Sequence, residues 1–225
     1  MATTFRLGLW QLSRAEEKTR LQSLMSERQQ MPVLNGNQLA LIEPPARLQA
    51  LESRAVQLSG QWLPGQTIFL DNRVMNRQAG FYVLTPLRLS GRDAVVWVQR
   101  GWAPRHVQDR QTLPPVTTPM AEVTVSGHIA IQLSRAYALG QDGTGAIRQN
   151  LDLDTSRAAT GWPLAHWVVW QTGAPSDGLL RDWPVPASGV DKHKGYAFQW
   201  FGLCALITLL LFWFQVIRPL RDRSR

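Results

Sequence analysis

An uninterrupted run of uncharged residues near the C-terminus constrains this chain more than any other feature. Residues 195–217, GYAFQWFGLCALITLLLFWFQVI, contain no Asp, Glu, Lys or Arg. At about 1.5 Å per residue, a helix of this length crosses the ~30 Å hydrocarbon layer of a membrane. A buried core helix is the alternative, but so long a run without a charge is rare in soluble domains. The sequence therefore predicts a transmembrane helix over residues 195–217, and its position excludes a secretory signal peptide.

The charges that flank this run predict its orientation. The basic tail, residues 218–225, has four arginines and one acid, whereas Lys192 and Lys194 before the run are partly offset by Asp191. The more positive flank normally stays in the cytoplasm, which places residues 1–190 outside. The N-terminus has no apolar run long enough to start export. Either a first transmembrane helix lies upstream of Met1, or the bulk of the chain is cytoplasmic and the tail inserts the other way. The arginine bias favours the first interpretation.

The remaining sequence is typical of one folded domain. About 190 residues suit a single domain, and an apolar content of 44% is enough to build its core. The net charge is +8, but outside the tail the basic residues are scattered among acids. No basic stripe exists, so nucleic acid is not an expected partner. The single cysteine, Cys204, lies inside the predicted span and leaves no disulfide framework.

Hydrophobic patterns divide this domain into helical flanks and strands. Residues 1–31 are expected to form an amphipathic helix, in which Glu16 and Arg20 are spaced to pair. A β-rich extracytoplasmic domain over residues 32–192 begins with a short helix at 46–53. Its strand-like segments are 56–59, 66–72, 80–89, 94–100, 122–126 and 165–171. Residues 90–93 (SGRD) predict a hairpin turn. The predicted fold class is α+β: a mainly antiparallel, barrel-like β domain with helical flanks and a C-terminal transmembrane helix.

Patterns typical of catalysis or metal binding are sparse. The four histidines are widely separated, and neither a phosphate loop nor a Gly-x-Ser-x-Gly elbow is present. Asp152 and Asp154 precede Thr155 and Ser156, an arrangement typical of a turn or a helix cap rather than of a catalytic dyad. We therefore expect a protein that is not an enzyme.

Several short sequence words are more specific than the composition. They are LGLWQL (7–12) followed by RAEEK (14–18), DNR (71–73), Gly80 with LTPL (84–87), RGWAP (100–104) and HKGYAFQWF (193–201). In this order and spacing they resemble the surfeit-locus family of cytochrome c oxidase assembly proteins, over nearly the whole chain. In that family the glycine-tryptophan-glutamine stretch directly follows a first spanning helix. Here Gly8-Leu9-Trp10-Gln11 stands almost at the N-terminus, and the family's first helix does not precede it.

The resemblance implies a location, partners and a role. Family members are integral proteins of the bacterial or mitochondrial inner membrane, with a folded domain on the outer side between two spanning helices. They are not known as enzymes, and they assist the insertion of haem a into the largest subunit of cytochrome c oxidase. We expect a bacterial inner-membrane protein, periplasmic in bulk with a cytoplasmic C-terminus. Its expected partners are the largest oxidase subunit, other assembly factors and membrane lipid. The alternatives are a haem-independent scaffold for oxidase intermediates and an unrelated anchored binding module.

His193 is the candidate cofactor-binding residue. It stands at the outer mouth of the predicted span, followed by Tyr196 and Trp200. The resemblance implies that it is the axial ligand of haem a, and no metal other than haem iron is expected. Neutral imidazole is a natural ligand of haem iron, and a neighbour can orient its other nitrogen. Lys192 and Lys194 could then pair with haem propionates, but the favoured interpretation is that both are solvated residues flanking the span. The alternative is that His193 only marks the membrane interface, where Tyr, Trp and Lys are also common.

Five further residues are candidates for structural or partner roles. Trp10 and Gln11 open the family-like sequence, and Trp10 is expected to be an aromatic-belt or packing residue. Gly101 is expected in a turn that has no room for a side chain. Arg100 is expected to pair with an acid or a carbonyl, and Trp102 to pack in the fold or to form part of a partner surface.

Overall fold

The chain forms two compact units. The computed structural model describes residues 1–39, 45–106, 108–109, 111–133, 145–183 and 189–223. Met1–Ser26 and Val185–Arg225 make up a helical unit, and Glu27–Pro184 make up a β-rich unit.

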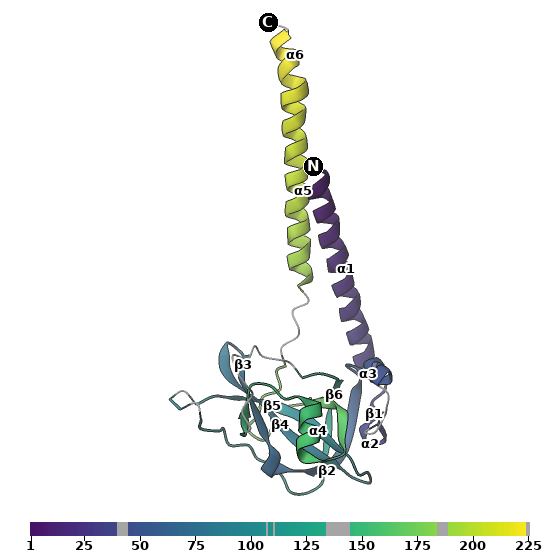
Figure 1. The fold of residues 1–225 in the computed structure, drawn as a ribbon, viewed down its shortest axis with the longest axis vertical. Coiled ribbons are helices and arrows are strands. Elements are labelled where there is room, and N and C mark those ends of the chain that lie inside the picture. Colours follow the sequence, from purple (N-terminus) through teal and green to yellow (C-terminus); the bar gives the residue numbers. More distant parts are fainter. Residues whose placement is uncertain (40–44, 107, 110, 134–144, 184–188, 224–225) are drawn as a thin grey trace. The chain divides into compact units, whose positions relative to one another are not determined.

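The helical unit contains the long apolar helix that the sequence predicts (Figure 1). Helix α5 (Val190–Phe212) begins after Gly189, whose φ of 66° lies in the left-handed region that favours glycine. A π-helical turn, η2 (Trp213–Ile217), and helix α6 (Arg218–Arg223) continue it. The most apolar 18-residue window within Val190–Leu220 has a mean hydropathy of 2.1, and none of that window is buried by protein. A core helix would be covered, so this exposed apolar helix is one that could anchor the chain in a membrane.

Helix α1 (Ala2–Gln30) confirms the predicted N-terminal helix but buries a different face. Its buried residues are Gly8 and Ala15. The larger apolar residues that suggested an amphipathic helix are exposed; they are Leu9, Leu12, Leu21, Leu24 and Met25. Glu16 and Arg20 form no ion pair with each other, so that expectation was wrong. Close helix packing selects small side chains here, and the leucine pattern did not reveal it.

The β-rich unit is built around a closed five-stranded barrel, which confirms the predicted fold class. Its strands are β1 (Leu34–Asn35), β2 (Ala55–Trp62), β3 (Ile68–Met75), β4 (Gln78–Leu89), β5 (Val95–Pro104), β6 (Val123–Ala130), β7 (Ile147–Arg148) and β8 (Leu164–Gln171). The sheet order is β1-β2-β6-β8-β5-β4-β3-β7, and β2 also pairs with β4. The strands β2, β6, β8, β5 and β4 therefore close into a ring. Short helices α2 (Gly36–Leu39) and α3 (Pro45–Leu51), the 3₁₀ turn η1 (Pro64–Gln66) and helix α4 (Leu153–Thr160) connect them.

Most strand pairs are antiparallel, with one substantial exception. The β4–β5 hairpin turns at residues 90–93 as predicted, and Gly91 has a φ of 71°. Asn76 and Arg77, both with positive φ, join β3 to β4 in the same manner. Strands β5 and β8 instead pair in parallel. A chain of sequential hairpins therefore does not describe the whole barrel, because β8 enters the ring between β5 and β6.

The buried apolar residues of these strands form three clusters, of which two are large. One cluster draws residues from all five barrel strands and so fills the interior; it includes Leu58, Leu87, Val98, Val125 and Trp167. A second cluster contains Trp97 and Trp102 of β5 with residues of β3 and β8. Because β5 is covered on both faces, nearly every residue along it is buried.

Helix α4 shows what the carboxylates near residue 152 do. Asp152 caps the helix by accepting a hydrogen bond from the Thr155 backbone N–H at 2.8 Å. Gly161, with a φ of 65°, ends it. The cap interpretation of this acid pair is confirmed for Asp152. The indole of Trp97 donates to the hydroxyl of Ser156 at 3.2 Å and so joins α4 to strand β5.

Candidate functional site

The N-terminal half of α1 packs closely against α5 through small residues. A Cβ atom on Gly8 would lie 2.6 Å from the Phe201 ring, so only glycine allows this approach. The rings of Phe5 and Phe201 meet edge to face with centroids 5.7 Å apart. Ala197 of α5 is buried as well. The two helices run antiparallel, because Met1 contacts Thr208 while residue 11 contacts residue 193.

This packing brings together two of the predicted site residues. The Nδ1 atom of His193 lies 2.6 Å from Oε1 of Gln11, although 182 positions separate them in sequence. Gly8, Gln11 and Ala15 are spaced i, i+3 and i+7 on α1, so they share one helix face. Because an amide oxygen can only accept, the imidazole donates from Nδ1 in this arrangement. The Nε2 atom has no hydrogen-bond partner among the described residues.

A hollow of about 430 Å³ lies beside this pair, on the side of α1 toward its C-terminus. It is lined by Leu12, Ala15, Glu16, Thr19 and Arg20 of α1 together with Lys194 of α5. Two cations and one acid therefore share one concave surface, next to an imidazole. Lys194 had been singled out in the sequence. The sequence pattern indicated Arg20 only as a partner for Glu16 and did not predict its position in this hollow.

The other aromatic candidates of this unit lie on its surface. Trp10 is 52% exposed and Tyr196 is 54% exposed, while Trp200 is half-buried. The Arg14 guanidinium lies 5.9 Å from the centre of the Trp10 ring. Lys192 is exposed and does not line the hollow. Aromatic rings in such positions are those that a membrane interface would favour.

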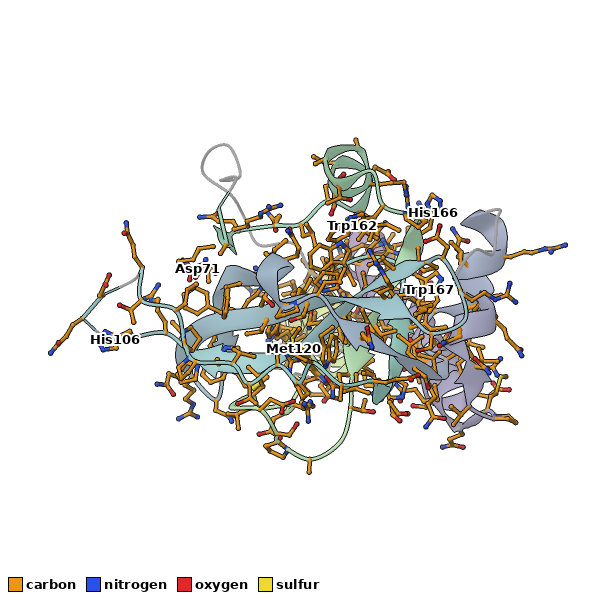
Figure 2. The ribbon with its side chains drawn as sticks, turned by 90° about the horizontal axis from the view of Figure 1, so that it is seen from below. Asp71, His106, Met120, Trp162, His166 and Trp167 are labelled. Carbon is orange, nitrogen blue, oxygen red and sulfur yellow. The ribbon has the colours of Figure 1, made fainter. Side chains whose placement is uncertain are left out.

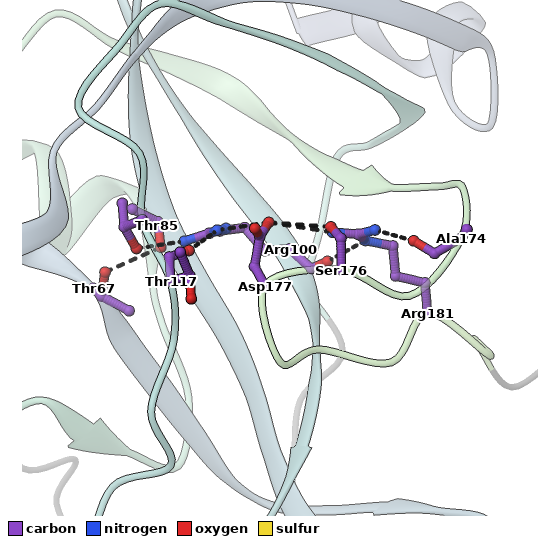
Figure 3. A network of polar contacts seen from close by, with 9 residues as sticks. Thr67, Thr85, Arg100, Thr117, Ala174, Ser176, Asp177 and Arg181 are labelled. Carbon is purple, nitrogen blue, oxygen red and sulfur yellow. Dashed lines mark hydrogen bonds and ion pairs between the residues drawn. The ribbon is translucent and has the colours of Figure 1, made fainter.

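Arg100 belongs to a buried polar network in the β-rich unit, shown in Figure 3. Its guanidinium donates to the Thr118 hydroxyl at 2.8 Å, to the Thr117 carbonyl at 2.7 Å and to the Asp177 carboxylate at 3.1 Å. It also lies 4.6 Å from the centre of the Trp62 ring. The expectation that Arg100 pairs with an acid or a carbonyl is confirmed, since it has both.

A second buried guanidinium extends this network. Arg181 donates from Nε to the Arg100 carbonyl at 2.8 Å and from its other nitrogens to the Ala174 carbonyl and the Ser176 hydroxyl. Asp177 lies between the two cations, 3.9 Å from Arg181. Burial lowers the pKa of Arg100, and the hydrogen bond that its guanidinium donates to Asp177 counteracts this. The network fastens residues 174–181 and the 117–118 segment to strand β5. No sequence signal had pointed to Asp177 or Arg181.

Gly101 is not in a turn, and that expectation was wrong. It lies inside β5, beside a bulge where the register with β4 shifts. A Cβ atom there would lie 2.6 Å from the Leu179 Cβ and 2.8 Å from the Leu180 carbonyl oxygen. The glycine is required by the close approach of another segment. Its neighbour Trp102 is buried and donates from Nε1 to the Arg73 carbonyl at 2.8 Å, which confirms the packing role.

The histidines of the β-rich unit do not converge. His106 and His166 lie at opposite ends of it (Figure 2). Among the described residues no group of three His, Cys, Asp or Glu side chains is placed to hold a metal ion. Burial lowers the pKa of His128 on β6 below 6.5. The residues with the most distinctive chemistry are therefore Gln11 and His193 in the helical unit.

Comparison with known proteins assigns the family. The sequence model described as the SURF1 family matches residues 1–205. A SURF1-like protein of Rickettsia bellii is 24% identical over 91% of this chain and 83% of its own length. Surfeit locus protein 1 of Rattus norvegicus is 25% identical over 95% of this chain and 72% of its own length. A SURF1-like protein of Drosophila melanogaster is 28% identical over 96% of this chain and 74% of its own. The chain belongs to the SURF1 family.

Proposed function

We propose that this protein is an assembly factor for cytochrome c oxidase that holds haem a transiently and presents it to the largest oxidase subunit. Membership of the SURF1 family implies a role in the assembly of this oxidase. The haem step is the proposal. It is a binding and delivery role, with no turnover reaction.

The observation that carries the haem step is the His193–Gln11 pair at the start of the apolar helix. A neutral imidazole is a common axial ligand of haem iron, and a ligand of this kind usually has its other ring nitrogen held by a hydrogen bond. His193 meets both conditions, because Gln11 holds Nδ1 at 2.6 Å and Nε2 has no hydrogen-bond partner among the described residues. The Nδ1 atom of His106 instead accepts a hydrogen bond from the Asp109 backbone N–H at 3.2 Å, so a neutral His106 carries its proton on Nε2.

The surroundings of His193 also suit the propionate groups and the apolar tail of haem a. Haem carries two propionate groups, and the hollow beside the histidine contains Arg20 and Lys194. Haem a also carries a long apolar tail, and α5 exposes a run of large apolar side chains beyond the site: Leu203, Leu206, Leu209, Leu210 and Phe212. A cargo with a charged edge and an apolar tail is expected at a membrane surface, where both environments meet.

Transient holding follows from the number and exposure of the groups. One histidine supplies one axial bond, and the flanking cations stand on a surface open to water. Charge pairs in that position contribute little affinity, typically about 0–1 kcal/mol each. A carrier that released its cargo slowly could not hand it on, so moderate affinity is consistent with delivery.

The membrane orientation is part of the proposal. We place the protein in the bacterial inner membrane, with the β-rich unit in the periplasm and the C-terminus in the cytoplasm. The arginine excess after residue 217 supports this orientation. Haem a would then be presented at the outer membrane face, beside the outer ends of the oxidase helices.

Oxidase from cells that carry the His193→Ala variant tests the proposal against a purely scaffolding role. The measured quantities are the membrane level of the largest oxidase subunit and its haem a content per subunit. Haem delivery predicts that His193→Ala lowers haem a per subunit, while His106→Ala, which changes an exposed histidine of the β-rich unit, does not. A scaffold predicts normal haem content in both variants and a reduced subunit level only in the deletion strain. Normal oxidase in the deletion strain would contradict both roles.

A further inference from the structure

The hydrogen bond between α1 and α5 has a chemical consequence for the histidine. We infer that Gln11 is a positioning residue that fixes His193 in the tautomer protonated at Nδ1 and so reserves Nε2 for iron. This inference rests on the proposed haem site and deepens it, because it names the residue that prepares the ligand.

A neutral imidazole carries its proton on only one of two nitrogens. Without a partner both tautomers are populated, and only one of them leaves Nε2 able to bind a metal. The Gln11 oxygen, 2.6 Å from Nδ1, accepts a hydrogen bond and stabilises the Nδ1–H form. A hydrogen bond from the distal N–H also raises the basicity of the ligand nitrogen, which strengthens its bond to iron.

The position of Gln11 on α1 indicates that its hydrogen bond to His193 is set by the packing of the two helices. It lies between the two buried small residues of the helix, Gly8 and Ala15, on the face that packs against α5. Gly8 leaves room for the Phe201 ring, and Ala197, one turn beyond His193, is buried on the opposing helix. The imidazole orientation is therefore set by the packing of two helices and does not depend on α5 alone.

A glutamine has specific properties in this position. Its amide oxygen is a neutral acceptor, so it selects the tautomer without removing the proton from the ring. A carboxylate would pull that proton more strongly and give the imidazole more anionic character, which favours ferric over ferrous iron. An apolar side chain would release the ring. Gln11→Glu and Gln11→Leu should therefore shift the reduction potential of the bound haem iron in opposite directions.

The tautomer can be measured without haem. The full chain is labelled with ¹⁵N-histidine in lipid nanodiscs at alkaline pH, and the His193 signals are assigned by their loss in His193→Ala. The chain has four histidines, so assignment is tractable. The wild type should show only the Nδ1–H form, and Gln11→Leu a mixture of tautomers. Gln22→Leu, which changes an exposed glutamine of the same helix, should match the wild type. A wild-type mixture, or an unchanged spectrum in Gln11→Leu with helix content preserved, would overturn the inference.

The effect on iron is measured with iron protoporphyrin IX as the probe. Gln11→Leu should weaken ferric binding about ten- to a hundred-fold and raise the reduction potential of the bound haem, and Gln11→Glu should lower that potential. Unaltered potentials in both variants would refute the positioning role while leaving the carrier role intact. If the wild type bound no haem at all, the proposed function would fail, and the nitrogen spectra alone would decide the role of Gln11.

Discussion

In the network around Arg100, we predict that replacing the partly exposed Asp177 destabilises the fold more than replacing the fully buried Arg100. Arg100 is 0% exposed, whereas Asp177 is 27% exposed, and Asp177 is the acid that both buried guanidinium groups share within the described ranges. Asp177→Asn removes that charge but keeps a residue that tolerates the positive φ of 60° at this position. It leaves two buried cations without a counter-charge. Breaking a buried ion pair from one side typically costs about 3–5 kcal/mol.

The stability loss caused by Asp177→Asn should fall near the lower end of this range of about 3–5 kcal/mol. The asparagine retains an oxygen that can still accept from Arg100, and partial exposure of residue 177 admits water, so we expect a loss of about 3 kcal/mol. For a unit of this size, each kcal/mol shifts the melting temperature by about 2–4 °C, so the midpoint should fall by about 6–12 °C. Arg100→Met removes the buried charge itself. The groups it releases are the Thr117 carbonyl, the Thr118 hydroxyl and the Asp177 carboxylate, all on residues that are exposed or half-buried. Water can therefore replace the lost hydrogen bonds, and this variant should lose only about 1–2 kcal/mol.

The assay is thermal unfolding of the full chain in detergent, followed by tryptophan fluorescence. The core of the β-rich unit contains Trp62, Trp97, Trp102 and Trp167, so the signal reports that unit. The double variant should show a coupling energy of at least about 1 kcal/mol, because once Arg100 is gone Asp177→Asn leaves only one buried cation, Arg181, without its acid. Additive losses within about 0.5 kcal/mol, or a larger loss in Arg100→Met than in Asp177→Asn, would refute this account of the network.

Three further outcomes are expected. Gly101→Ala should destabilise the β-rich unit by about 1–3 kcal/mol, because its Cβ would press on the Leu180 carbonyl; thermal unfolding should show no such loss for Gly65→Ala, which has open space around it. Burial lowers the folded-state pKa of His128 below the 6.5 of the unfolded chain, so the unfolded state binds a proton first as the pH falls. The free energy of unfolding should therefore be independent of His128 above about pH 7 and decline as the pH falls through 6.5 toward the folded-state pKa, and His128→Gln should flatten that decline in urea titrations. Arg20→Gln should weaken binding of iron protoporphyrin IX but not of its dimethyl ester, which lacks the propionate charges; equal weakening of both would exclude an electrostatic role for Arg20.

Local rules in the sequence predicted much of the fold. The strands at 80–89 and 94–100 were recognised from their β-branched and aromatic residues, and the turn between them from its Ser-Gly-Arg-Asp sequence. Asp152 was recognised as a cap from the residues that follow it. Pairing between distant strands was not predictable in this way. Strand β5 is buried on both faces, so it shows no alternation to reveal that β8 runs parallel to it.

The sequence likewise predicted one part of the candidate site but not the other. His193 stood out because an imidazole at the mouth of an apolar helix is chemically distinctive. Its contact with Gln11 depends on how two helices pack, and the residues that set this packing, Gly8 and Ala15, are too small to register in a hydrophobic pattern. The leucines of α1 were more conspicuous, yet they face outward. Gly101 was expected in a turn, because a glycine between Arg100 and Trp102 suggests a bend until the segment packed against it is known.

The visible absorption spectrum of the protein, purified in detergent from cells that synthesise haem a, tests the central claim most directly. The account predicts a haem a band that is lost in His193→Ala and retained in His106→Ala. A colourless wild-type protein would contradict haem delivery and leave scaffolding as the better explanation. A band that survives in His193→Ala would contradict the assignment of the ligand.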